Sequence, residues 1–150
     1  MKILIGTPIH VCKDYAIERW LENVSKLQLE YPADFLMVDN SPGIDYIKKV
    51  KRYCIKYGIT NYQIKHLELP PEQNVFERVA RSREIIRKHI ISHGFEAWFS
   101  WECDQLIPKN SLSELIKMMK SGSFTIASHS TWLRQNSNEI LDELFGTTLI

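Results

Sequence analysis

Short apolar runs alternate with longer amphipathic segments along the chain. The three most compact apolar runs, each the length of a buried strand, are Ile3 to Gly6, Phe35 to Val38 and Ala97 to Trp101. Between them, apolar residues recur every three or four positions, which predicts helices. The three clearest helical segments run from about Asp14 to Pro32, from Ile44 to Gly58 and from Val75 to His93.

The other segments of the sequence show weaker patterns of apolar and polar residues. Gln63 to Leu67 and Thr125 to Ser128 are shorter strand candidates. Ser111-Leu-Ser-Glu114 has the spacing of a capping box, which would open a short helix through Met119. Ser137 to Phe145 is predicted as a last, poorly patterned helix. Gly58 and Gly94 follow helical segments and suit the left-handed conformation that often ends a helix.

Strands that alternate with helices indicate an α/β fold, with a mostly parallel sheet flanked by helices on both faces. The 150 residues correspond to one domain spanning residues 1–150. Ligands of such sheets bind outside the carboxyl ends of the strands. Three polar segments follow predicted strands, and we expect them at one edge of the sheet: Thr7-Pro8, Asp39-Asn40 and Glu102-Cys-Asp104.

Composition narrows the classes of partner. The formal net charge is +1 and no basic stripe is visible, so nucleic acid is not an expected partner. The three cysteines form no CxxC pair, which favours reduced thiols over a disulfide framework or zinc site. No targeting segment and no run long enough for a transmembrane helix is present. We expect a cytoplasmic protein that would meet a membrane only peripherally or through a partner.

Two carboxylates stand at the end of the third strong strand. Glu102 and Asp104 are two residues apart, so extended backbone could direct both side chains the same way. Such a pair provides hard oxygen ligands for Mn²⁺ or Mg²⁺, whose other positions would be filled by water and phosphate oxygens. The alternative from spacing alone is an ordinary charged turn after a strand.

The other polar residues also have two interpretations. Asp39 could accept hydrogen bonds from a base or ribose, or could form an Asx-turn with its own backbone. The third helix carries Arg78 and Arg81 on one face and Arg83 and Arg87 on another. One arginine directed at a pocket would suit a diphosphate, whereas the rest are best explained as a solvated face. His10 and Cys12 lack the framework of a nucleophilic site.

The order of these segments resembles glycosyltransferase family 2 and related GT-A enzymes over roughly residues 1 to 130. The motifs that carry the resemblance are Ile3-Leu-Ile-Gly-Thr-Pro8, Met37-Val-Asp-Asn-Ser41, Val79-Ala-Arg-Ser82 and Trp101-Glu-Cys-Asp-Gln-Leu-Ile-Pro108. The last is similar to the metal-binding D-x-D motif of that family, with glutamate in place of the usual first aspartate. Neither a dinucleotide fingerprint nor a P-loop occurs in the sequence.

The resemblance implies a metal-dependent transfer of sugar from a nucleotide-diphosphate donor to a hydroxyl of an unknown acceptor, which could be a glycan, a lipid or a protein. Under it, the nucleotide would be held by Thr7, Pro8, Asp39, Arg81 and Glu102. Mn²⁺ or Mg²⁺ would be bound by Asp104 and flanked by Glu102, whose longer side chain could instead reach the ribose.

The catalytic base in the resembled family comes late in the chain. Here the acidic residues available for that role are Glu139, Asp142 and Glu143, with Asp142 and Glu143 the candidates. None stands in a recognisable motif, so a non-catalytic nucleotide-sugar-binding module of the same fold is the alternative function. A sugar-nucleotide pyrophosphorylase is a further alternative, but Gly6 alone does not make the glycine-rich loop of those enzymes.

Overall fold

The computed structural model describes residues 1–122, 126–128, 133–134, 140–141 and 148–149. The helices are η1 (Val11–Lys13, a 3₁₀ turn), α1 (Asp14–Glu30), α2 (Asp45–Lys56), α3 (Val75–His93) and α4 (Ser111–Ser121). The longer strands are β1 (Ile3–Ile9), β2 (Asp34–Asp39), β3 (Tyr62–His66) and β4 (Ala97–Ser100). Two-residue strands follow: β5 (Ala127–Ser128), β6 (Leu133–Arg134), β7 (Ile140–Leu141) and β8 (Thr148–Leu149).

One sheet of six strands organises the molecule in the order β3-β2-β1-β4-β8-β5. The first four of these strands are mutually parallel, and β8 runs antiparallel to both β4 and β5. The chain winds from β1 outward to β3 and then returns through α3 to place β4 on the other side of β1. The direction of winding therefore reverses between β1 and β4, and such a reversal opens a crevice at the carboxyl ends of the two strands.

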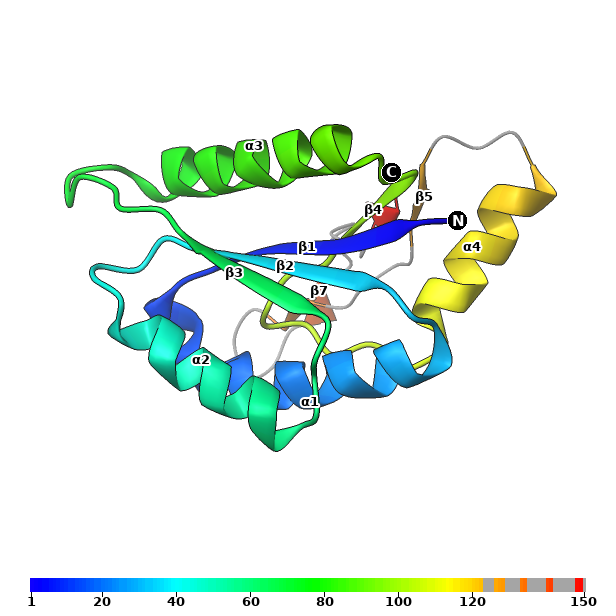
Figure 1. Ribbon diagram of the computed structural model, residues 1–150, viewed down its shortest axis with the longest axis horizontal. Coiled ribbons are helices and arrows are strands. Elements are labelled where there is room, and N and C mark those ends of the chain that lie inside the picture. The colour runs from blue at the N-terminus through cyan, green and yellow to red at the C-terminus, as the bar shows by residue number, and fades with distance from the viewer. Residues whose placement is uncertain (123–125, 129–132, 135–139, 142–147, 150) are drawn as a thin grey trace.

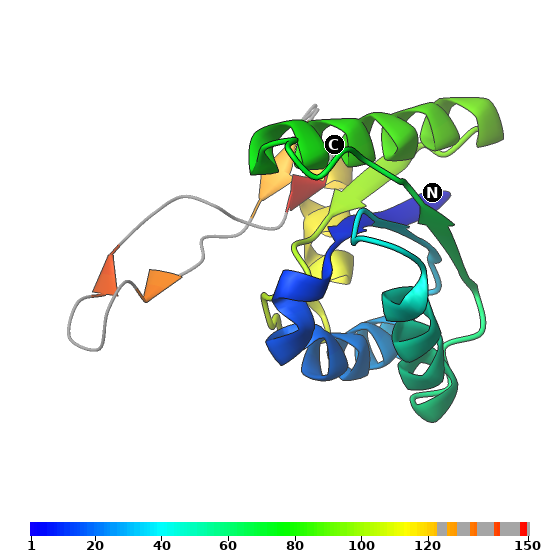
Figure 2. The ribbon, with the colours of Figure 1, turned by 90° about the vertical axis from the view of Figure 1, so that its left-hand side faces the viewer.

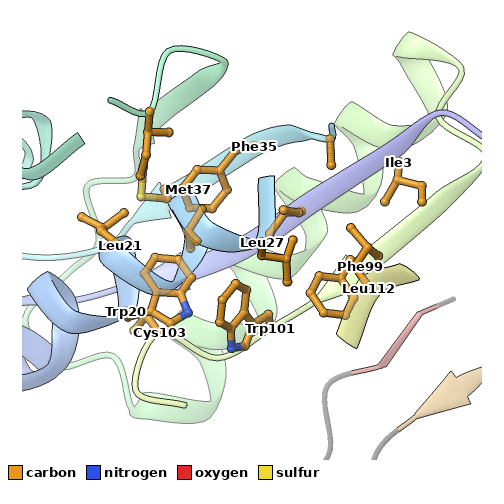
Figure 3. Packing of buried hydrophobic residues seen from close by; sticks show 14 of the residues in the cluster. Ile3, Trp20, Leu21, Leu27, Phe35, Met37, Phe99, Trp101, Cys103 and Leu112 are labelled. Carbon is orange, nitrogen blue, oxygen red and sulfur yellow. The ribbon is translucent and has the colours of Figure 1, made fainter. Parts of the chain in front are cut away.

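Helices cover both faces of the sheet, with α3 on one face and α1 and α2 on the other (Figure 1). The larger apolar core lies on the side of α1, α2 and α4. Its aromatic centre joins Trp20 of α1 to Phe35 of β2 and to Trp101, with ring centroids 5.5 and 5.4 Å apart respectively (Figure 3). A smaller cluster under α3 contains Leu4, Leu36, Val38 and Ile86. The α/β architecture expected from the sequence is thus confirmed.

Successive side chains of β1 point alternately into the larger core and into the cluster under α3. Ile3 and Ile5 belong to the larger core, whereas Leu4 lies in the cluster under α3. Gly6 also faces α3, because a Cβ atom at this position would lie 2.4 Å from Cγ2 of Ile86. The absence of a side chain at Gly6 therefore sets how closely α3 packs on the sheet.

Several predicted boundaries are confirmed by the structure. The helix α3 occupies the predicted range, and Gly94 ends it with a left-handed φ of 63°. Gly58, which follows α2 and its cap residue, has a left-handed φ of 67°. Ala127–Ser128 is a strand within the predicted segment.

Three predictions of local structure were wrong. The first strand continues to Ile9, so Thr7 and Pro8 lie inside β1 rather than after it. Pro8 is accommodated because β1 pairs with β4 only as far as Gly6, and the missing N–H therefore interrupts no ladder on that side. The capping box at Ser111 does not form: Asn110 is the N-cap residue and Ser111 is buried in the first turn.

The third correction concerns the last predicted helix, from Ser137 to Phe145. Ile140–Leu141 is a strand paired antiparallel with Leu133–Arg134, so a continuous helix does not form there. The acidic residues suggested as bases, Glu139, Asp142 and Glu143, lie outside the described residues. Within the described ranges, none of the helices is both long enough and apolar enough to cross a lipid bilayer.

Candidate functional site

A cavity of about 610 Å³ lies at the carboxyl edge of the sheet, where the winding reverses between β1 and β4. Figure 2 faces this edge. Apolar atoms make up most of the cavity surface, and four separate segments line it. The lining residues are Pro8, Ile9, His10, Cys12, Lys13, Asn40, Pro42, Gln73, Asn74, Val75, Arg78, Val79, Glu102 and Cys103. Its size and its few polar groups are typical of small-molecule sites.

Arg78 is the basic residue that α3 directs into this cavity. Three backbone carbonyl groups hold its guanidinium: Nε donates to Gln73 at 2.9 Å, Nη2 to Pro71 at 3.1 Å, and Nη1 to Asn40 at 3.5 Å. No carboxylate in the described part of the chain forms an ion pair with it. Arg78 is therefore a fixed and uncompensated positive charge on the cavity wall, which favours an anionic ligand.

Arg81, the arginine assigned to the nucleotide by resemblance, has a different environment. Its side chain is exposed and does not line the cavity. With the Gln73 amide turned so that its oxygen faces Arg81, that oxygen accepts hydrogen bonds from Nε at 3.0 Å and from Nη2 at 2.9 Å. The structure thus places Arg78, one turn earlier on α3, where an arginine could contact a diphosphate.

Lys13 is a second cationic residue on the cavity wall, and nothing in the sequence pattern singled it out. It ends η1, immediately after β1, and its ammonium group forms an ion pair with Asp104. Tyr15 also donates to the same carboxylate oxygen, at 3.1 Å. Burial disfavours the charge on Lys13, but the hydrogen bond and the charge of Asp104 outweigh it and raise the pKa of the ammonium group. The only sequence signal was a basic residue a few positions beyond a strand end.

The carboxylates of the Glu102-Cys-Asp104 segment do not converge. Trp101 and Cys103 are buried in the larger core and anchor the loop. Oε1 of Glu102 accepts from Nη2 of Arg83 on α3 at 2.6 Å, whereas Asp104 pairs with Lys13 across the sheet edge. Burial raises the pKa of the Cys103 thiol to about 12, so this residue offers no thiolate.

The predicted metal ligands therefore do not fit a divalent ion as they stand. Glu102 and Asp104 each face a different cationic side chain. Nowhere in the described residues do three or more histidine, cysteine or acidic side chains gather as they would around a metal ion. Manganese or magnesium binding stays a prediction from the sequence.

Asp39 ends β2 and is fully buried. Its Oδ1 accepts from the backbone N–H of Ser41 at 3.1 Å, the Asx-turn contact considered from the sequence. Its Oδ2 lies 2.9 Å from Nδ1 of His66, whose Nε2 lies 2.8 Å from Oε2 of Glu68. Glu68 most of all, then Asp39, raises the pKa of His66 against the opposing effect of burial. Asp39 is absent from the cavity wall, so its contact with a nucleotide stays a prediction.

Thr7 and Pro8 have separate roles. Thr7 is fully buried and its hydroxyl donates to the carbonyl of Trp101 at 2.7 Å, which ties β1 to the chain beyond β4. Pro8 lines the cavity, and its contact with a nucleotide stays a prediction. His10 also lines it, and its Nδ1 accepts from the backbone N–H of Cys12 at 3.0 Å. Burial and then the charge of Arg78 lower the pKa of His10, so its ring is neutral near pH 7.

Comparison with solved structures identifies the fold. The chain superposes on S. aureus TarS with a TM-score of 0.60 at 18% sequence identity, covering 81% of this chain and 20% of TarS. A TarS fragment of residues 1–349 in complex with UDP gives a TM-score of 0.58 at 16% identity, covering 84% of this chain and 34% of the fragment. TarS is a glycosyltransferase of the GT-A type.

This chain has the GT-A fold. It spans between a fifth and about a third of the length of these TarS chains. Neither a protein-family model nor a curated protein sequence matches it. At these identities the likeness establishes the arrangement of strands and helices, and the chemistry has to be argued from the residues of the cavity.

Proposed function

We propose that the cavity binds the nucleoside diphosphate part of a nucleotide sugar, and that the chain is the donor-binding part of a glycosyltransferase. The observation that carries this proposal is Arg78, a fixed guanidinium with no carboxylate partner among the described residues, in a mainly apolar cavity at the sheet edge. A diphosphate satisfies such a charge bidentately. Apolar wall residues such as Pro8, Pro42 and Val79 suit the uncharged face of a base.

The chemistry of sugar transfer agrees with these residues. When the bond between the sugar and the diphosphate breaks, negative charge develops on the leaving phosphate oxygen. Fixed cations aimed at that oxygen stabilise the charge without reorganising. Arg78 and Lys13 both line the cavity wall, which supports this role for them. The acceptor hydroxyl must lose a proton, and assignment of that step to Asp142 or Glu143 stays a prediction from the sequence.

The solved neighbours support the choice of ligand class. One of the superposed TarS structures is a complex with UDP. The GT-A fold and a cavity at the carboxyl edge of its sheet are features of this chain. A uridine nucleotide is therefore the first ligand to test.

Thermal unfolding with nucleotides provides the test. The midpoint is measured with UDP, GDP, ADP and CDP, each with EDTA and with MnCl₂. We expect one nucleotide to raise the midpoint and Arg78→Met to abolish the rise. Arg81→Met, one turn away and outside the cavity, is the matched control and should respond like the parent. Equal responses of the two variants would contradict the assignment of Arg78, and no rise with any nucleotide would contradict the proposed ligand.

A non-catalytic binding module is the second candidate, favoured by one observation. Among the described residues of the cavity wall, the only carboxylate is that of Glu102, and it is engaged by Arg83, so this wall offers no unengaged carboxylate to act as the base. Slow release of free sugar from the matching nucleotide sugar separates the candidates. An enzyme hydrolyses the donor at a rate that Arg78→Met lowers, whereas a binding module binds it without hydrolysis.

A further inference from the structure

The chain carries its own cation at the position where the sequence suggested a divalent metal ion. Lys13 follows β1, Asp104 follows β4, and the two strands are neighbours in the sheet. Their side chains form an ion pair at the edge of the cavity. Asp104, the predicted metal ligand, is thus already neutralised by a residue of the same chain.

The contacts around Asp104 also fix the direction of the ammonium group. Tyr15 and Lys13 both donate to Oδ2 of Asp104. An ammonium group has three N–H donors, so the bond to Asp104 leaves donors for a ligand. The side chain of Lys13 is 41% exposed to solvent, whereas that of Asp104 is 24% exposed. The ammonium group is therefore the more accessible partner of this pair.

The second predicted metal ligand, Glu102, forms an ion pair with a different cationic residue, Arg83 of α3. The helices α3 and η1 lie on opposite faces of the sheet (Figure 1). A metal ion shared by Glu102 and Asp104 would have to break both ion pairs and lie close to Lys13, a like charge. Among the described residues that line the cavity, Lys13 and Arg78 are cationic and Glu102, which is paired with Arg83, carries the one carboxylate. This excess of positive charge suits an anion better than a second cation.

We infer that Lys13 takes the place of the divalent metal ion, binding the diphosphate together with Arg78 and held in position by Asp104. Lys13 enters from η1 and Arg78 from α3, which begin on opposite faces of the sheet. A diphosphate between them would be contacted by a point charge on one side and a planar guanidinium on the other. The inference rests on the proposed function, because it concerns how the same ligand is bound.

Titration calorimetry with UDP and GDP, in EDTA and in MnCl₂, tests the inference. We expect the parent protein to bind one of these nucleotides in EDTA, and Lys13→Met to raise the Kd by about tenfold or more. Lys49→Met is the matched control, since Lys49 also forms a partly exposed ion pair, with Asp14 at 2.6 Å. It should leave the Kd within about twofold of the parent. Lys13→Arg restores a cation and should recover most of the affinity lost in Lys13→Met.

The Lys13 explanation and the metal-ion explanation predict different nucleotide binding by Asp104→Asn. If Lys13 is the cation, this variant keeps the ammonium group, removes a neutralising charge and still binds in EDTA. If a metal ion is required, the variant loses binding in MnCl₂ and the parent fails to bind in EDTA. The second result would overturn the inference but leave the proposed function standing, as would unchanged binding by Lys13→Met. Absence of binding under every condition would remove both proposals. Thermal midpoints without ligand confirm that each variant is folded.

Discussion

Asp39 closes β2 with both carboxylate oxygens bonded inside the protein. A fully buried carboxylate is stable only when it is paired and hydrogen-bonded. His66, at the end of the neighbouring strand β3, supplies the side-chain partner and is itself bonded to Glu68. The first role of Asp39 is therefore to join the ends of two parallel strands beside the cavity.

This arrangement predicts a pH-dependent contribution to stability from His66. Its folded pKa is raised above the unfolded value of about 6.5, so the stabilisation is complete below that pH. The stabilisation is then lost as the pH rises through the folded pKa. Chemical unfolding of the parent and of His66→Gln between pH 5.5 and 9 should show the difference in unfolding free energy shrinking above about pH 6.5.

The Glu68 variant provides the control for that experiment. Glu68 is the largest cause of the raised pKa of His66, so Glu68→Gln should move the loss of stabilisation to lower pH. The slope cannot exceed about 1.4 kcal/mol per pH unit for one proton. A difference between parent and His66→Gln that does not change with pH would show that His66 is not charged in the folded protein.

Single-residue assignments were the part of the site that the sequence predicted least well. Helical spacing put Arg78 and Arg81 on one face, but only the packing of α3 against the sheet decides which guanidinium reaches the cavity. No sequence pattern pointed to Lys13, because its place in the site depends on the ion pair with Asp104, which lies 91 residues further along the chain. Glu102 was correctly expected at the sheet edge, since its position after a strand was enough to place it. Pro8 also lies at that edge, but inside β1 rather than after it.

At the scale of elements, the contact of α3 with the central strand positions the cavity wall that carries Arg78. Gly6 allows this contact: a Cβ atom there would lie 2.4 Å from Cγ2 of Ile86 and 2.8 Å from Nε1 of Trp98. Trp98 also donates to the carbonyl of Gly6 at 3.0 Å. A methyl group at Gly6 would push α3 and Trp98 away from β1.

Gly6→Ala should therefore destabilise the protein by about 1–3 kcal/mol through overpacking. Denaturant unfolding of Gly6→Ala, Ile86→Ala and the double variant measures this effect. Removing Cγ2 of Ile86 gives the new methyl group room, so the double variant should lose less stability than the sum of the single variants. Strict additivity would mean that the two residues do not compete for the same space.

Element types and helix ends were predictable because their causes are local. Apolar spacing and the terminal glycines, Gly58 and Gly94, indicated where α2 and α3 end. The extension of β1 through Pro8 was missed because turn-forming residues usually stop a strand. Here the neighbour β2 runs alongside to Asp39 and pairs with Ile9, so tertiary context prolongs the strand. Likewise, the N-cap residue of α4 is Asn110, one position before the expected Ser111, which is buried as the first residue of the helix.

At the scale of the whole molecule, the cavity exists only when distant segments are assembled. Its wall combines the chain after β1, the turn after β2, the start of α3 and the loop after β4. The unfolded chain has no such cavity, so a ligand that fills it must stabilise the native state. The alternation of strands and helices predicted this meeting of strand ends, whereas the shape and charge of the cavity required the side-chain packing of all four segments.

Ligand linkage gives a quantitative prediction for the intact chain. A nucleotide at about one hundred times its Kd should stabilise the fold by about 2.7 kcal/mol. For a domain of this size, that corresponds to a rise in the melting temperature of about 5–11 °C. The rise should grow with the logarithm of ligand concentration, and its fitted Kd should agree with calorimetry. A shift that levels off while calorimetry shows one saturating site would indicate that the nucleotide also binds the unfolded chain. Agreement would show that the nucleotide binds the folded chain alone, as expected for a cavity that only the folded chain contains.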